Sequence, residues 1–536
     1  MIYQQQLKEK SGVLPRVVHL SQSDRKGGAA LAASRLHQGL QRAGYSSSLF
    51  VCDRVSDDPN TIAFQPAQFQ ELNPIPTVGG YLFTDDRSPY QSEILHQLPD
   101  ADIVHLHWVA GFVDYAHFLS NLAPVAPIVW TLHDTNPFTG GCHGNVGCDR
   151  FTVACGACPQ LGSTQESDRS REIWQRKDQA LKKVDRDRLH IVTPSQWLAD
   201  RVKESSLLRE YPLTVIPNAL DLEVFAPRDR AFSREILGIP PEAKVLLFAA
   251  NYLEDPYKNF PALIEAIEQL PNIKNIFLLS VGRGTNKLPV SLPYLHLGYI
   301  NQPRFLSLIY SAADLFVLPS KQDNFPNVCL EAIACGLPVV AFPTGGIPEM
   351  VRSNVTGLLA SEATSKALSR AIATLLQAPQ HLKQMRHNCR EIALKEYNLE
   401  QQAQCYSALY QQHYHDAIVL GEGWHPLETY EGKTFQWVTN DAQFSIKNPT
   451  GLRTTLRLNI EPGPSLIHLP LELYLCDRRD RIATKIFIQY RTIIFLQLSI
   501  SPNQNNQFRL HLENKSQELT TDPRILNFRV FSLGWS

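Results

Sequence analysis

Short apolar runs alternate with longer amphipathic segments along the chain up to about residue 415. Runs of about four to eight residues rich in β-branched side chains predict strands, and apolar residues at helical spacing predict helices. The expected strands form two groups, 16–20, 48–52, 103–108, 128–132 and 190–194 in the first, and 244–250, 276–281, 315–319 and 338–342 in the second. Repeated strand–helix units of this kind predict two doubly wound α/β domains with parallel sheets.

The region between the two groups, 213–225, is flanked and interrupted by prolines and marks the expected domain boundary. We therefore expect an N-terminal Rossmann-like domain over 14–212 and a second Rossmann-like domain over 213–398. A helix within 399–418 is expected to return toward the first domain. Doubly wound sheets bind ligands beyond the carboxyl ends of their strands, so the two domains should face each other across a cleft.

The pattern changes at about Gly421, where short strands with alternating apolar residues begin. Turns rich in Pro, Asn, Asp and Gly separate these strands, which is typical of an all-β sandwich. We expect a sandwich-like accessory domain over 421–536. Its aromatic residues, among them Trp437 and Tyr490, leave two alternatives, which are glycan binding by stacking and a structural core or docking role.

Composition limits the function classes. A chain of 536 residues is too long for one core, because single cores stop growing at roughly 250–300 residues. Lys and Arg together number 51 and Asp and Glu 52, so no overall charge attracts nucleic acid or an anionic membrane. The polar N-terminus lacks the apolar core of a signal peptide, and no apolar run is long enough to span a bilayer. We expect a cytoplasmic protein, with peripheral contact at the inner face of the membrane left open.

A glycine pair follows the first expected strand and opens a helix. Gly27 and Gly28 allow a ligand to approach the backbone, and the helix N-terminus offers free N–H groups to phosphate or sugar oxygens. The alternative is an ordinary strand–helix turn. The spacing is not G-x-G-x-x-G, which disfavours a dinucleotide cofactor.

His133 and Asp134 directly follow the expected strand 128–132. A histidine at the carboxyl end of a parallel strand faces the cleft and can donate a hydrogen bond to a sugar hydroxyl or a phosphate oxygen. The alternative is a histidine on an exposed loop. Two adjacent acid pairs elsewhere, Asp57-Asp58 and Asp85-Asp86, lie in polar stretches and are expected to be solvated.

Four cysteines lie close together in the sequence and end in a C-x-x-C pair. Four thiolates on one long loop suit a tetrahedral structural zinc site, although the spacing is not that of a common zinc finger. The alternatives are four reduced thiols or a disulfide formed under oxidising conditions. The candidate ligands are Cys142, Cys148, Cys155 and Cys158.

Lys258 lies beyond the expected strand 244–250 and just before an amphipathic helix. A lysine in this place can neutralise a diphosphate, although most such lysines are solvated surface residues.

The most informative segment runs from Pro319 to Met350. A strand ends, a polar loop and a short helix follow, and a buried strand then leads to the Gly345-Gly346 turn and another helix. Asp323 and Glu331 lie eight residues apart, one on the loop and one on the helix. Carboxylates accept hydrogen bonds from vicinal hydroxyls, which ribose and hexoses both carry. The alternative is a βαβ unit whose acids are incidental.

This segment resembles the donor-site signature of the retaining glycosyltransferases of family 4, which have the GT-B fold. The signature is Glu-x7-Glu followed by Ala-x-Gly-x-Pro-Val-Val and Gly-Gly-Ile-Pro-Glu, and here Asp323 stands in the first acidic position. The Lys-Gly-Gly-Ala-Ala start, the His-Asp loop and the cysteine cluster resemble the subgroup that builds colanic acid and other exopolysaccharides. The resemblance covers about residues 14–415 and contains four motifs in the family's order.

The resemblance implies a role for each motif. Glu331 would bind the ribose, Lys258 would bind the diphosphate, and His133 would contact the sugar near its anomeric carbon. Gly27 and Gly28 would approach the donor from the first domain. The transferred sugar would be held by Asp323, Asn324, Phe325, Pro326 and Asn327. Many members of the family pair the lysine with an arginine, whose place is taken here by Asn251, and Arg283 is a candidate replacement.

The implied activity is transfer of a sugar, with retention of configuration, from a UDP- or GDP-linked donor to a glycan or lipid-linked glycan during polysaccharide synthesis. Catalysis would rest on positioning and on stabilisation of the leaving diphosphate, without a catalytic metal or other cofactor. One alternative is a sugar phosphorylase or epimerase of the same fold. Another is a non-catalytic sugar-binding protein in which the β-sandwich is the functional module.

Overall fold

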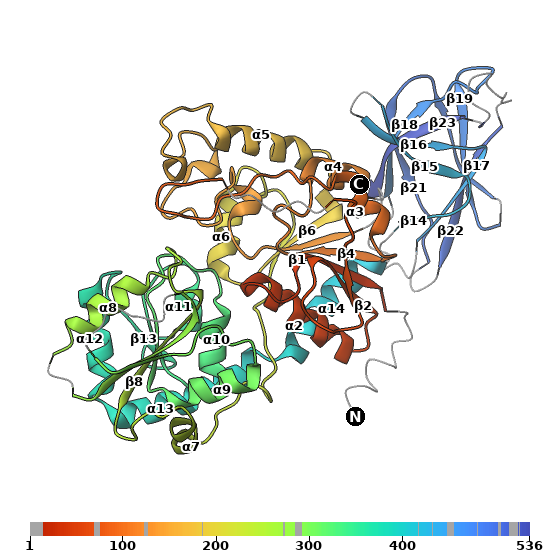
Figure 1. Ribbon diagram of the computed structural model, residues 1–536. Helices are drawn as coiled ribbons and strands as arrows, with labels where there is room; N and C mark the ends of the chain where they lie inside the picture. Colours follow the sequence, from red (N-terminus) through yellow and green to blue (C-terminus); the bar gives the residue numbers. More distant parts are fainter. Residues whose placement is uncertain are drawn as a thin grey trace.

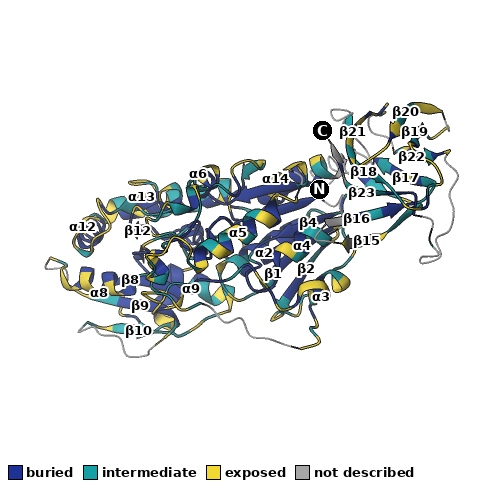
Figure 2. Ribbon diagram, turned by 90° about the horizontal axis from the view of Figure 1, so that it is seen from above, coloured by how far each residue is buried: buried dark blue, intermediate teal, exposed yellow. Residues whose placement is uncertain are grey.

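The computed structural model describes residues 14–68, 75–122, 127–184, 186–271, 274–284, 292–415, 418–430, 433–446, 455–479, 481–501, 505–513, 524 and 526–535. The polar N-terminal segment, in which we expected no signal peptide, lies outside these residues. The chain forms two α/β domains and a C-terminal β domain, and the first α/β domain lies between the other two parts (Figures 1 and 2). Among the helices of the described residues, none is long and apolar enough to cross a membrane.

The first domain is built on a seven-stranded parallel sheet with strand order β3-β2-β1-β4-β5-β6-β7. Its strands are β1 (Val17–Ser23), β2 (Ser47–Asp53), β3 (Thr61–Ala63), β4 (Ile103–Leu106), β5 (Ile128–Thr131), β6 (Leu189–Thr193) and β7 (Leu213–Val215). Its helices are α2 (Gly28–Arg42), α3 (Gln91–Gln97), α4 (Tyr115–Asn121), α5 (Arg169–Leu181) and α6 (Gln196–Glu204). The central strands β4, β5 and β6 are buried along their whole length, as expected for a sheet covered on both faces.

The second domain has a six-stranded parallel sheet with strand order β10-β9-β8-β11-β12-β13. Its strands are β8 (Lys244–Tyr252), β9 (Ile276–Arg283), β10 (Tyr294–His296), β11 (Leu315–Leu318), β12 (Val339–Ala341) and β13 (Gly357–Leu359). Its helices are α7 (Arg230–Ile236), α8 (Phe260–Glu268), α9 (Pro303–Ala312), α10 (Asn327–Ala334), α11 (Ile347–Met350), α12 (Ser365–Leu376) and α13 (Pro379–Glu396). The two parallel sheets confirm the predicted doubly wound architecture.

Helix α14 (Leu399–His415) leaves the second domain and packs against α2 of the first (Figure 1). Its Tyr406 and Tyr410 are buried beneath the first sheet, where their hydroxyls lie 2.8 Å from Thr131 Oγ1 and 2.5 Å from His105 Nδ1. These contacts fix the C-terminal end of the second domain to the sheet whose strand β5 leads to His133.

The C-terminal domain contains two five-stranded antiparallel sheets, with orders β14-β17-β22-β19-β20 and β15-β16-β23-β18-β21. The strands are β14 (Ile418–Leu420), β15 (Trp424–Tyr430), β16 (Lys433–Val438), β17 (Asp441–Ile446), β18 (Thr455–Pro462), β19 (Leu471–Asp477), β20 (Ile482–Ile488), β21 (Thr492–Gln497), β22 (Asn506–Leu512) and β23 (Phe528–Trp535). Alternate residues of both sheets share one apolar core. Among the aromatic residues considered for glycan binding, Trp437 is buried and Tyr490 is exposed.

The structure departs from the expected pattern in places where the sequence signal is short. The strands β3, β7, β10 and β13 span three residues each, which is too few for a recognisable period. Strand β7 extends the first sheet to Val215. The prediction that Asp85 and Asp86 are solvated is wrong, because Asp86 is 2% exposed and Arg176 of α5 lies within 2.6 Å of both carboxylates.

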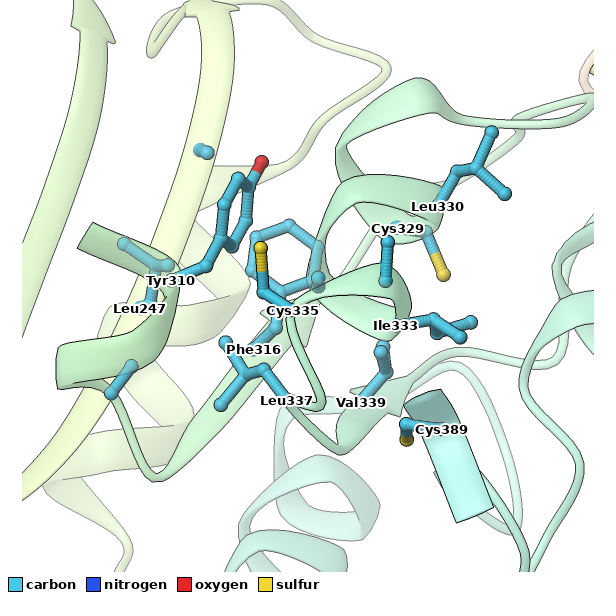
Figure 3. Packing of buried hydrophobic residues seen from close by; sticks show 14 of the residues in the cluster. Leu247, Tyr310, Phe316, Cys329, Leu330, Ile333, Cys335, Leu337, Val339 and Cys389 are labelled. Carbon is cyan, nitrogen blue, oxygen red and sulfur yellow. The ribbon is translucent and has the colours of Figure 1, made fainter. Parts of the chain in front are cut away.

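Helix α10 is buried on nearly all sides, which explains its apolar composition. Leu330 and Ile333 have no exposed surface and pack with Leu247 of β8 and Phe316 of β11 in one cluster (Figure 3). Burial at 25 cal/mol per Å² makes each such side chain worth about 2 kcal/mol. This core fixes the position of the loop that precedes α10, which carries Asp323.

Candidate functional site

The loop between β11 and α10 is supported from below by the turn that contains Gly345 and Gly346. Gly345 has φ +60°, and a Cβ atom there would lie 1.9 Å from the carbonyl oxygen of Asp323. Gly346 N–H donates to that same oxygen at 2.9 Å, and its own Cβ position lies 2.0 Å from the carbonyl oxygen of Asn324. Only glycine fits both places, so the glycine pair holds the acidic loop in position.

Lys258 and Asp323 meet in an ion pair between Nζ and Oδ2. Lys258 follows β8, and Asp323 follows β11, so neighbouring strands bring the two side chains to one edge of the sheet. Burial would lower the pKa of Lys258, but the nearby carboxylate and its hydrogen bond outweigh that effect and raise the pKa. Lys258 is therefore a charged ammonium at neutral pH.

Glu331 faces the first domain from helix α10. Arg35 Nη2, on α2, lies 2.5 Å from its Oε1, and the Tyr310 hydroxyl donates to its Oε2 at 3.0 Å. The side chain of Glu331 is 6% exposed and that of Arg35 12%. The structure thus places Glu331 in a contact between domains, apart from the Lys258–Asp323 pair.

His133 lies just beyond β5 and contacts the second domain through its backbone. Its carbonyl oxygen accepts from Asn324 Nδ2 at 3.3 Å. Its Nε2 lies 3.1 Å from His107 Nδ1, and His107 Nε2 lies 3.0 Å from His19 Nδ1. Burial lowers the pKa of His133 to about 4, so the ring is neutral near pH 7.

The histidines behind His133 form a buried cluster. Ring nitrogens of His19, His105 and His107 lie within 4.8 Å of one another. Both nitrogens of His105 have hydroxyl partners, Tyr410 at 2.5 Å and Thr131 at 2.7 Å. The pKa of each of these three histidines is lowered well below its usual value, chiefly by burial. The cluster is therefore a set of neutral, hydrogen-bonded imidazoles that supports His133.

The other expected donor-site residues fall into two groups. Asn327 Nδ2 donates to the carbonyl oxygen of Gly28 at 2.7 Å, so the loop of the second domain meets the glycine pair of the first. Arg283 Nη1 lies 2.5 Å from Asn251 Oδ1, at the ends of β8 and β9. Its guanidinium also stacks 3.7 Å from the ring of Tyr299.

Two neighbours of Asp323 have structural positions. The ring of Phe325 is buried against Tyr397, 5.9 Å between centroids, so it packs in the core. Pro326 precedes the first turn of α10 as its N-cap residue.

A cavity of about 700 Å³ opens between the two domains. Lys258, Asp323 and Asn324 of the second domain line it, and His133 and Asp134 line it from the first. The lining also includes Tyr252, Glu254 and Tyr257 from the segment just before Lys258, and Tyr81, His143 and Trp197, which the sequence did not single out. Tyr81, His143 and Trp197 come from loops far apart in the chain, so no local motif marks them.

Comparisons with known proteins agree with this geometry. The model of glycosyltransferase family 4 matches residues 26–224, and the model of glycosyl transferases group 1 matches residues 229–395. Sucrose-phosphate synthase from Thermosynechococcus elongatus superposes with a TM-score of 0.55 at 21% identity, over 74% of this chain and 98% of that one. Anabaena HepE in complex with UDP and glucose superposes with a TM-score of 0.54 at 18% identity, over 74% and 99%. The two α/β domains are those of a GT-B glycosyltransferase.

Two relatives by sequence share one name. The D-inositol 3-phosphate glycosyltransferase of Segniliparus rotundus is 32% identical over 184 residues, which are 32% of this chain and 41% of that protein. Its counterpart in Mycobacterium marinum is 28% identical over 287 residues, 51% of this chain and 54% of that protein. The chain thus spans about half the length of these two relatives.

The cysteine loop forms part of the wall of the GT-B cleft. It includes the short 3-10 helices Asn136–Phe138, Arg150–Thr152 and Pro159–Leu161. Its His143 and Gly144 line the cavity, and the hydroxyl of Tyr257 donates to the carbonyl oxygen of Gly144 at 3.2 Å. Lys177 is buried beneath the start of the loop, where its Nζ donates to the carbonyl oxygen of Asn136 at 2.5 Å.

The four cysteines of this loop are free thiols. Burial raises the pKa of Cys155 to about 11, and its sulfur accepts the N–H of Gly140 at 3.1 Å. Within the part of the chain that the structure describes, no three of the four sulfur atoms come within 4.8 Å of one another. The thiols gather on one loop but do not have the spacing of a tetrahedral metal site in this arrangement.

Asp134 is the centre of a polar network. The sequence analysis named Asp134 only as the neighbour of His133. Trp108 Nε1 donates to Asp134 Oδ2 at 2.8 Å, and His143 Nδ1 lies 2.7 Å from the same oxygen. Burial would raise the pKa of Asp134, but His143 and the hydrogen bonds outweigh that effect and lower the pKa. Asp134 is therefore an ionised carboxylate at the cleft.

Proposed function

We propose that the protein transfers a sugar, with retention of configuration, from a UDP- or GDP-linked donor to a glycan or lipid-linked glycan in polysaccharide synthesis. The observation that carries the proposal is the Lys258–Asp323 pair, which lines the same interdomain cavity as His133. A cation, a carboxylate and a histidine from facing domains are the groups that a sugar diphosphate needs. The HepE complex with UDP and glucose supports the same type of donor.

In the proposed donor complex, Lys258 exchanges its contact with Asp323 for the diphosphate of the donor. Asp323 then accepts hydrogen bonds from hydroxyls of the transferred sugar. Gly27 and Gly28 present backbone N–H groups at the start of α2, and Gly28 already lies beside Asn327. Arg283, held by Asn251, supplies a second cation at the strand ends.

Glu331 is proposed to bind the ribose. Its two oxygens already have partners in Arg35 and Tyr310. Each carboxylate oxygen carries a second lone pair, so the ribose hydroxyls can be accepted beside these contacts. Arg35 would then link nucleotide binding to the first domain.

The proposed chemistry places the acceptor hydroxyl on the face of the sugar from which the diphosphate leaves. The leaving phosphate takes the proton of the acceptor, so no carboxylate is assigned as a base and no metal has a step. Lys258 stabilises the developing charge on the diphosphate, which is an electrostatic contribution. Neutral His133 contacts the sugar near its anomeric carbon and helps to position it.

A second candidate is transfer to an inositol phosphate, which the names of the sequence relatives favour. A phosphorylase, an epimerase and a non-catalytic sugar-binding protein are less well supported. The Lys258–Asp323 pair and the close-fitting Gly345–Gly346 turn are present together, as an active donor site requires.

The domain limits are proposed at 14–212, 213–398, 399–418 and 421–536. We propose a cytoplasmic location, with contact at the inner face of the membrane when the acceptor is lipid-linked. The β domain is assigned an accessory role in docking or glycan binding.

We propose that a structural zinc on Cys142, Cys148, Cys155 and Cys158 stabilises the cleft wall, which requires the four sulfur atoms to lie closer together than in this structure. Cys142 and Cys158 already pack in one small core with Phe83. Metal analysis of purified protein tests this assignment, and less than about half an equivalent of zinc counts against a four-ligand site.

Donor screening tests the proposed function. Purified protein is incubated with UDP-, GDP- and ADP-linked sugars, and release of the nucleoside diphosphate is measured with and without glycan acceptors. Release from a UDP- or GDP-sugar is expected. No release from any donor, together with no thermal shift by the free nucleotides, contradicts the proposal.

A further inference from the structure

Part of the cavity lining has no role in the proposed donor site. It includes four aromatic rings, two from each α/β domain: Tyr81 and Trp197 from the first, Tyr252 and Tyr257 from the second. The rings of Tyr81 and Tyr257 come together across the cleft, with centroids 4.7 Å apart and an angle of 54° between their planes. Aromatic rings in general stack on the C–H face of a sugar or cyclitol ring.

The same surface carries three carboxylates besides Asp323, which are Asp134, Glu254 and Asp255. Asp134 is held in place by Trp108 and His143, and Asp255 accepts the N–H of Tyr257 at 2.9 Å. A carboxylate accepts hydrogen bonds only, so its natural partners are hydroxyl groups. The lining therefore combines ring faces with acceptors for hydroxyls.

Positive charge in the cavity is scarce. Among the lining residues that the structure describes, Lys258 is the single lysine or arginine, and it is paired with Asp323. Lys321 lies outside the lining, 6.0 Å from the ring of Tyr81. Arg283 lies 5.4 Å from the ring of Tyr252 and is assigned, with Lys258, to the donor diphosphate. An acceptor phosphate would then meet Asp134, Glu254 and Asp255 with no lysine or arginine of the described lining left to pair with it. Repulsion between a charged ligand and like charges in a site is an effective means of excluding that ligand.

We propose that these aromatic rings and carboxylates form an acceptor subsite for an uncharged, hydroxyl-rich ring, and that the subsite excludes acceptors with a phosphate beside the reacting hydroxyl. The inference rests on the proposed function. It predicts an acceptor that differs from the inositol 3-phosphate in the name of the sequence relatives. Specificity here comes from repulsion as much as from attraction.

Calorimetric titration with matched probes tests the subsite directly. The full-length protein, alone and with UDP bound, is titrated with myo-inositol and D-inositol 3-phosphate, and with glucose and glucose 6-phosphate. Each phosphorylated probe should bind about tenfold or more weakly than its uncharged partner, because of the carboxylates. Equal or tighter binding of a phosphorylated probe overturns the inference, and so does the absence of binding by both uncharged rings.

Variants at two positions separate the contributions of charge and ring. Glu254 is exposed, so Glu254→Lys should leave the fold intact. It should reduce the ratio of the affinities for the uncharged and phosphorylated probes about fivefold, and Glu254→Gln should have an intermediate effect. Tyr81→Ala should weaken binding of the uncharged rings about fivefold, whereas Tyr81→Phe retains the ring and should bind nearly as wild type. Unchanged discrimination in Glu254→Lys, or unchanged binding in Tyr81→Ala, contradicts the assignment.

Failure of the inference and failure of the proposed function are distinguishable. Binding of UDP is measured in the same experiment, and nucleoside diphosphate release is measured without any acceptor. A protein that binds UDP and prefers a phosphorylated ring retains the proposed donor function and loses this inference.

Discussion

The two walls of the cleft are built in different ways. The wall of the second domain comes from two short segments, 252–258 and 322–324, and buried helix α10 and the Gly345–Gly346 turn position the segment that carries Asp323. The wall of the first domain is assembled from separate pieces, among them Tyr81, His133, His143 and Trp197. The Asp323 segment is supported by residues close to it in the chain, whereas the first-domain wall depends on the folding of the whole domain.

The supports of the two walls also differ in their chemistry. Behind Asp323 lie apolar side chains and a tight backbone turn. Behind His133 lie the neutral imidazoles of His19, His105 and His107. An apolar support does not respond to pH, but neutral histidines do, so the first-domain wall should be sensitive to acid.

The largest effect is therefore expected from mild acid. Burial lowers the pKa of His133 to about 4 and those of His19, His105 and His107 well below the ordinary 6.5. At pH values between the lowered pKa of each histidine in the folded protein and 6.5, its value in the unfolded chain, the unfolded chain binds more protons than the folded one. The contribution of these histidines to the free energy of unfolding is therefore fully present above pH 6.5 and falls as the pH drops. Each proton taken up costs about 1.4 kcal/mol per pH unit.

Calorimetry between pH 7.5 and 5 measures this loss, and hydrogen exchange locates it. Strands β1, β4 and β5 should lose protection at a higher pH than β8 and β11. His107→Gln should reduce the slope of stability against pH by about one proton. Equal loss of protection in both sheets would contradict the comparison of the two walls.

The next effect concerns the charge on the second-domain wall. Lys258→Ala removes the cation assigned to the diphosphate and should lower kcat/KM about 100-fold or more, a loss of about 3 kcal/mol of transition-state stabilisation. Steady-state kinetics with the preferred donor measures the change. Lys244→Ala, at the other end of β8, is the matched control. A rate in Lys258→Ala equal to that of the control removes Lys258 from the site.

Much of the fold could be predicted from the sequence, because most strands of the two parallel sheets are buried on both faces and appear as short apolar runs. The edge strands β3, β7, β10 and β13 could not, since each spans three residues and is only partly buried, whereas the three-residue strand β12 is fully buried and appears as an apolar run. The Asp323 loop was recognisable because its supports lie within about 25 residues of it in the chain. Arg35 and Tyr81 were not, because their positions at the cleft depend on how distant segments pack together.

A smaller effect is expected from the turn below Asp323. Gly345→Ala places a Cβ atom 1.9 Å from the carbonyl oxygen of Asp323 and adds a side chain at φ +60°. Gly238 also has a positive φ, +64°, but its Cβ position has no neighbour within 4 Å. Gly238→Ala should cost about 1 kcal/mol from backbone strain alone, and Gly345→Ala about 2 kcal/mol more from the clash. Denaturant unfolding of the two variants measures the difference, and equal values would show that the turn does not support the loop.

The smallest effect is expected from the contact that joins the two walls. Glu331→Gln keeps the shape of the side chain but removes the charge that Arg35 and the ribose share. The donor KM should rise about tenfold with kcat nearly unchanged, because the ribose contact is the same in the ground and transition states. Arg35→Met provides the complementary change, since it leaves the carboxylate but removes its partner across the cleft. If Glu331 serves only to hold the domains together, both variants will lower the unfolding temperature by similar amounts and neither will change the affinity for UDP.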